Sequence, residues 1–181
     1  MLRLFTIAVA FALGLTLAPL PAEAACLAFT RAPKTFQGMD LILNRRFDKR
    51  SHGVVLKYGG KGQLLSVFKY AKRRDRITDE TLAEQLDGAA GAIESAARQR
   101  GDDILARDKL DDWWVEDVVF QGRTLTATYR QYDTQAFEYV GLSHKRGCLF
   151  KVRYTNAKDG NERLAAKRFK WYVREAVAQF R

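Results

Sequence analysis

The order of helical and strand-like segments is the feature that most constrains the fold of this chain. Apolar residues recur at helical spacing after Thr78, in a segment that Thr78 or Asp79 can cap and that Gly101 can end in a left-handed conformation. A second helical segment, Arg163–Phe180, follows a series of strand-like stretches. Two helices combined with such strands predict an α+β sandwich.

The strand-like segments are separated by turn residues, as the strands of an antiparallel sheet are. Val54–Tyr58 and Leu64–Lys72 flank Gly59-Gly60-Lys61-Gly62, which predicts a hairpin turn rather than a phosphate loop, because a strand and not a helix follows. Between the helices, five further segments are separated by turn residues that include Gln121-Gly122. These segments are Ile104–Lys109, Trp114–Phe120, Leu125–Tyr132, Phe137–Ser143 and Cys148–Tyr154. We expect an antiparallel β-sheet of about 6–7 strands packed with two main helices.

Two glycines in the first helix, Gly88 and Gly91, lie among many alanines. A solvent-exposed helix gains nothing from glycine, so these residues predict close packing of the helix on the sheet.

Residues 1–24 have the pattern of a secretory signal peptide. Arg3 precedes an apolar run, and Ala22-Glu23-Ala24 has the spacing of small residues at a cleavage site. An uncleaved membrane anchor is the alternative, but the run is shorter than the roughly 18–20 apolar residues of a membrane span. We therefore expect a periplasmic or secreted single domain over residues 25–181, with an irregular N-terminal segment over 25–52 and no transmembrane segment after cleavage.

The two cysteines, Cys26 and Cys148, both lie in the expected exported part. An even number of cysteines in an oxidising compartment favours one disulfide between them. A competing interpretation makes Cys26 the lipid-bearing first residue of a lipoprotein. Glu23 argues against it, because a carboxylate stands where such a processing site has an aliphatic residue.

The chain is basic, with a formal net charge of +10. Outside the cytoplasm this charge favours an acidic envelope component or protein as partner, and peripheral contact with anionic lipid head groups is compatible with it. The export signal and the absence of an interleaved basic–aromatic motif exclude nucleic acid. A solvated basic surface without a ligand is the alternative. The residues expected to form the basic binding surface are Lys72, Arg73, Arg74, Arg76, Lys167 and Arg168.

The last helix has cations on its polar side and an apolar stripe on the other. Such a helix can lie on an anionic membrane, but the stripe is more typical of packing on the protein's own sheet.

The order of a hairpin around Tyr58–Tyr70, the Asp79–Arg100 helix, the Phe120–Tyr154 meander and the Arg163–Phe180 helix resembles the PsbP-like class. This class takes its name from the extrinsic protein of photosystem II and includes DcrB-like exported proteins. The resemblance covers residues from about 50 to 181 and rests on element order alone. It implies an α+β sandwich and a non-catalytic accessory or assembly role, and it assigns no site residue.

One segment, Ser143-His144-Lys145-Arg146-Gly147-Cys148, indicates an enzymatic alternative. It resembles the Ser/Thr-His-Gly-Cys signature of exported L,D-transpeptidases, which implies Cys148 as nucleophile and His144 as its partner. Two residues are inserted between His and Gly, and Phe150 replaces the family arginine. The competing interpretation is a basic hairpin turn in which Cys148 forms the disulfide.

Two neighbouring tryptophans, Trp113 and Trp114, lie among acidic residues. Core positions are expected for both, although an outward tryptophan would be a contact anchor. The acidic spacing does not fit a calcium loop, and the two histidines and two cysteines form no zinc pattern, so we expect no metal and no cofactor. These observations favour an exported non-enzymatic binding or accessory protein of the bacterial cell envelope.

Overall fold

The computed structural model describes residues 26, 29, 31–48, 53–71, 77–129, 134–145, 147–157 and 160–180. The expected signal peptide and the expected basic residues Lys72, Arg73, Arg74 and Arg76 lie outside the described residues. Within this part of the chain, eight strands form one antiparallel sheet in the order β1-β2-β3-β4-β8-β7-β6-β5. The strands are β1 (Thr35–Phe36), β2 (Met39–Arg46), β3 (Val54–Gly60), β4 (Gln63–Ala71), β5 (Asp103–Val115), β6 (Val118–Tyr129), β7 (Thr134–Lys145) and β8 (Cys148–Asn156).

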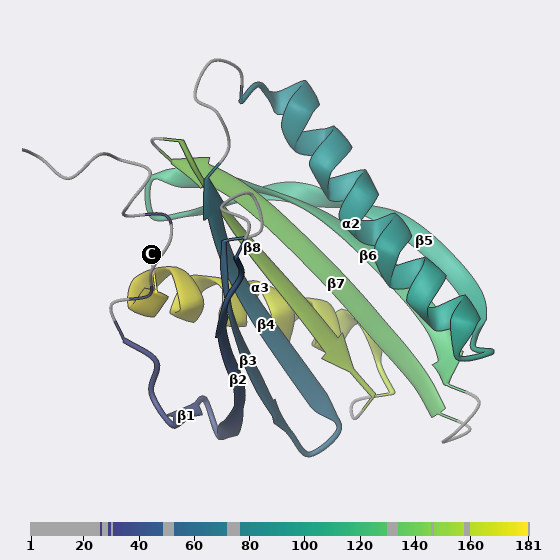
Figure 1. Ribbon diagram of the computed structural model, residues 1–181. Coiled ribbons are helices and arrows are strands. Elements are labelled where there is room, and N and C mark those ends of the chain that lie inside the picture. Colours follow the sequence, from purple (N-terminus) through teal and green to yellow (C-terminus); the bar gives the residue numbers. More distant parts are fainter. Residues whose placement is uncertain are drawn as a thin grey trace, which may run out of the picture.

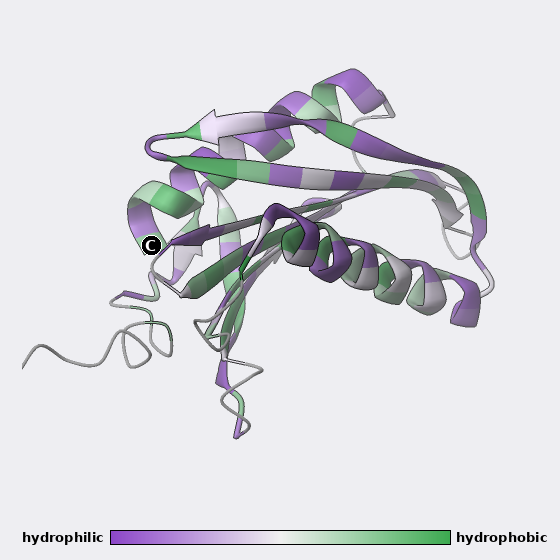
Figure 2. Cartoon of the chain, turned by 90° about the horizontal axis from the view of Figure 1, so that it is seen from above, coloured by the Kyte–Doolittle hydropathy of each residue, from purple (hydrophilic) through white to green (hydrophobic). Residues whose placement is uncertain are grey.

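Two helices, α2 (Asp79–Gln99) and α3 (Glu162–Phe180), lie on opposite faces of this sheet. Figure 1 shows α2 in front of β5–β7 and α3 behind the sheet, and the view from above in Figure 2 shows the sheet passing between the two helices. The α+β class is confirmed. The helix assignments are confirmed too, since Thr78 caps α2 by exchanging hydrogen bonds with Thr81 and Gly101 follows it with a φ of +78°.

The strand number differs from the expected 6–7 for two reasons. The N-terminal segment contributes β1 and β2, whereas the three segments expected between Ile104 and Tyr132 form only two strands, β5 and β6. Leu41, Ile42 and Leu43 are consecutive rather than alternating, and along β2 only Met39 is buried. A strand near the edge of a sheet needs no alternating apolar pattern, so the sequence signal for β2 was weak.

Two buried clusters hold the layers together. The smaller lies between α2 and the sheet, where Leu82, Leu86 and Ile93 pack with residues of β6, β7 and β8. The larger lies on the α3 side and is rich in aromatic residues: Phe169 of α3 stacks on Tyr139 of β7 with ring centroids 5.2 Å apart, and Tyr172 contacts Tyr154 at 5.0 Å. The apolar stripe of α3 therefore packs on the protein's own sheet, as predicted.

Gln121-Gly122 is not a turn but lies within β6, and the chain reverses instead at Glu116-Asp117. Gly122 faces Gly141 across the β6–β7 pair, and the ring of Trp113 lies on this pair. A Cβ atom added to Gly122 would come within 2.9 Å of the Trp113 ring. The glycine therefore permits a close approach of an aromatic ring to the sheet, which the sequence pattern does not distinguish from a turn.

The expectation for Gly88 and Gly91 was wrong. Both glycines are exposed on α2, and an added Cβ atom would have no neighbour within 4 Å. The sheet-facing side of α2 is instead formed by its larger residues, Leu82, Leu86 and Ile93.

Gly122 and Gly88 provide a matched test of the packing. We expect Gly122→Ala to lower the free energy of unfolding by about 1–3 kcal/mol, because Trp113 must shift from the sheet. Gly88→Ala should raise it by up to about 1 kcal/mol, because alanine favours an exposed helix position and meets no neighbour. Urea unfolding followed by circular dichroism measures both values. A neutral Gly122→Ala variant would contradict the placement of Trp113.

Candidate functional site

Cys148, the nucleophile of the enzymatic alternative, is bonded to Cys26, with the two Cα atoms 5.3 Å apart. The register of β7 and β8 pairs His144 with Leu149 and Lys145 with Cys148. Because successive side chains alternate between the faces of a strand, His144 and Cys148 point to opposite faces of the sheet. In this form Cys148 has no thiolate, and His144 is not placed to accept its proton.

A thiol titration of the unfolded, non-reduced protein checks this bond. We expect no reactive thiol before reduction and two after it. Reduction should also destabilise the protein by up to about 4–5 kcal/mol, because the bond closes a long loop of the unfolded chain. Two reactive thiols before reduction would contradict the disulfide and reopen the enzymatic alternative.

The two neighbouring tryptophans have different environments. The Trp113 ring stacks on Phe120 at 5.6 Å and meets Phe169 edge-on at 5.7 Å, so it belongs to the α3-side packing. Trp114 points to the other side of β5 and is 72% exposed. The expectation of core positions for both is therefore wrong for Trp114, because β5 is the last strand of the sheet and no described element covers Trp114 there.

The outward side of α3 carries the described part of the expected basic surface. We call it the basic face of α3; Lys167 is exposed on it and Arg168 is partly exposed. Leu164 and Trp171 also remain exposed there, at 54% and 37%. The helix as a whole has five cations and only two carboxylates. The basic face comprises Arg163, Leu164, Lys167, Arg168, Lys170, Trp171 and Arg174.

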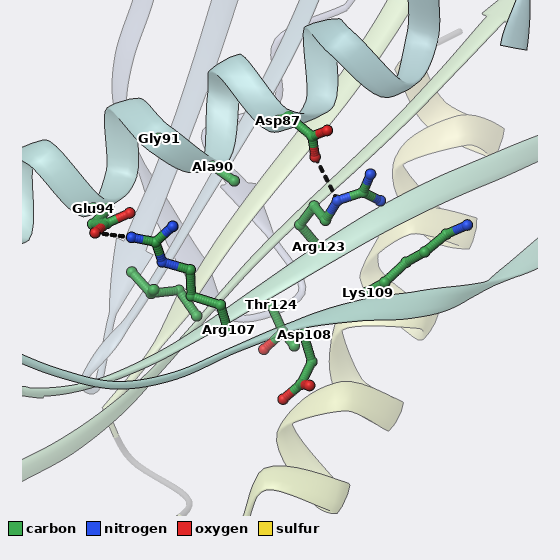
Figure 3. A pocket seen from close by; sticks show the side chains of 10 residues that line it. Asp87, Ala90, Gly91, Glu94, Arg107, Asp108, Lys109, Arg123 and Thr124 are labelled. Atoms are coloured by element: carbon green, nitrogen blue, oxygen red, sulfur yellow. Dashed lines mark hydrogen bonds and ion pairs between the residues drawn. The ribbon is translucent and has the colours of Figure 1, made fainter. Parts of the chain in front are cut away.

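The helix on the other face of the sheet has the opposite charge: α2 carries five carboxylates and one cation. Two of these carboxylates pair with cations of the sheet beneath them (Figure 3): Asp87 with Arg123 at 2.6 Å, and Glu94 with Arg107. The two pairs line a hollow of about 420 Å³ beside α2, together with Lys109. No spacing in the sequence indicates these pairs, because their members lie on different elements.

Glu94 is the most strongly paired of these carboxylates. A hydrogen bond from Arg98 and the charges of Arg107 and Arg98 together hold the pKa of Glu94 below its usual value near 4.5. Hydrogen bonding to the charged form outweighs the opposing effect of burial.

The sign of this shift gives a pH dependence. A carboxyl group with a lowered pKa in the folded state stabilises the protein fully above its unfolded pKa and loses that contribution as pH falls below it. We expect Glu94→Gln to destabilise the protein at pH 7, with the difference from wild type shrinking as pH falls below about 4.5. Urea unfolding across pH checks this. A difference that grows on acidification would contradict it.

Within the described residues, no three His, Cys, Asp or Glu side chains lie together as possible metal ligands. None of the described helices has the length and apolar character of a membrane span.

Comparison with known proteins gives one solved structure to report. The chain is similar to the solution structure of cyanobacterial PsbP (CyanoP) from Synechocystis sp. PCC 6803, with 11% sequence identity, a TM-score of 0.45, and coverage of 77% of this chain and 79% of that chain. No protein-family model matches the chain, and no curated protein matches it in sequence. This likeness assigns no site residue to the chain.

Proposed function

We propose that this is an exported, non-enzymatic accessory protein of the bacterial cell envelope whose basic face of α3 docks on an acidic partner. The partner to which we commit is the anionic head-group layer of a membrane, contacted peripherally. The observation that carries the proposal is the excess of cations on α3 around the exposed Leu164 and Trp171.

The packing of α3 determines what it can offer to a partner. Its apolar residues, among them Phe169, Val173 and Phe180, are buried on the sheet, so they are not available to enter a bilayer. What faces outward is a row of cations that runs from Arg163 to Arg174, roughly 16 Å along the helix axis. A row of this length suits an extended anionic surface, and a tryptophan among cations suits the head-group region.

The expected free energy of binding favours weak, reversible docking. Each Lys or Arg near an anionic membrane contributes about 1 kcal/mol, so the excess of three cations on α3 gives about 3 kcal/mol. The acidic α2 on the opposite face is repelled by the same surface, so the two helices together set one orientation. Association of this kind weakens strongly with salt.

Sedimentation with vesicles tests the proposal. We expect binding at low salt to vesicles that contain phosphatidylglycerol, little binding to pure phosphatidylcholine, and release at high salt. Arg163→Glu combined with Lys167→Glu should abolish the binding, because both positions are exposed on the basic face.

The matched control is Lys57→Glu combined with Lys109→Glu, which makes the same change of charge away from α3. Its binding should remain close to that of the wild type. Equal binding to both kinds of vesicle, or equal losses in the two double variants, would overturn the proposal.

A further inference from the structure

A hollow of about 860 Å³ lies on the α2 side of the sheet, away from the basic face of α3. Its walls are the β3–β4 turn, the segment that follows α2, and the paired ends of β7 and β8. The volume lies within the range of small-molecule sites. The lining residues that matter here are Lys61, Leu64, Arg100, Glu138, Arg153 and Thr155.

Glu138 and Arg153 form the firmest pair in the hollow. The guanidinium of Arg153 donates to both carboxylate oxygens of Glu138 at 3.0–3.2 Å, and the Thr155 hydroxyl donates to Oε2 at 2.8 Å. The Glu138 side chain is 1% exposed, whereas that of Arg153 is 31% exposed. The carboxylate is therefore buried behind the guanidinium, which it holds in one orientation at the wall of the hollow.

Arg100 and Asp102 repeat this arrangement at the end of α2. Arg100 Nε donates to Asp102 Oδ2 at 2.9 Å, and the side chains are 45% and 4% exposed respectively. In both pairs a buried acid fixes an arginine that remains accessible. An apolar pair of similar size would hold the sheet as well as a buried ion pair does, so what each pair adds is an oriented cation at the wall.

We propose that this hollow binds a small organic acid, with its anionic group on the guanidinium groups of Arg153 and Arg100 and its apolar body against Leu64. Oriented guanidinium groups match the geometry of carboxylate and phosphate oxygens, which is why arginine is favoured in such sites.

A further observation supports an anionic ligand. Lys61 lies at the same hollow in the β3–β4 turn, so three cations line the wall against two buried carboxylates.

The probe for the test is 8-anilinonaphthalene-1-sulfonate, which joins an anionic group to an apolar body and fluoresces when bound away from water. Its neutral analogue, N-phenyl-1-naphthylamine, has the same ring body without the sulfonate. We expect saturable binding of the sulfonate at one site per chain and much weaker binding of the neutral analogue.

Two variants locate the site. Glu138→Gln combined with Arg153→Gln removes the pair without leaving a buried charge, and the dissociation constant of the sulfonate should rise at least about tenfold. Lys61→Glu, at an exposed turn position, should raise it in a chain whose folded core is untouched. Lys109→Glu is the control and should leave it unchanged. Equal binding of the two probes, or an unchanged constant in both site variants, would overturn the proposal.

Discussion

Aromatic packing between α3 and the sheet is the interaction on which the rest of the molecule depends. Phe169 lies against Tyr139, Tyr154 and Trp113, and Phe180 lies against Phe36, Tyr58 and Phe29 at the other end of the helix. Truncation of one such buried ring typically costs about 3–5 kcal/mol, which is much of the stability of an ordinary domain. The same contacts fix the rotation of α3 and so decide which residues face outward.

The charge distribution follows from this packing. Because the two helices lie on opposite faces of the sheet, the cations of α3 and the carboxylates of α2 are kept apart. On the α2 side the carboxylates are partly matched by Arg107 and Arg123 of the sheet. The fold therefore produces one basic side, and a second side on which cations meet buried acids in pairs such as Arg153 with Glu138.

Local signals in the sequence predicted much of the architecture. The cap at Thr78, the Gly59–Gly62 turn and the stripe of α3 each depend on neighbouring residues, so they could be recognised without a structure. The predictions of a turn at Gly122 and of a core position for Trp114 were wrong. Gly122 meets Trp113 of another strand, and Trp114 lies on the last strand of the sheet. The hollow around Arg153 is formed by β7, β8, the β3–β4 turn and the end of α2. No residue spacing in the sequence predicts that these elements lie together.

In the proposed docking, the basic face of α3 meets the anionic surface while α2 faces away from it. Nitroxide labels at Leu164 and Ala178, and in separate samples at Ala92 and Ser95 of α2, leave every cation in place. On phosphatidylglycerol vesicles, we predict that the labels at Leu164 and Ala178 lose accessibility to a water-soluble relaxation agent, while those at Ala92 and Ser95 keep it. Loss of accessibility on α2, or no loss on α3, would contradict this orientation.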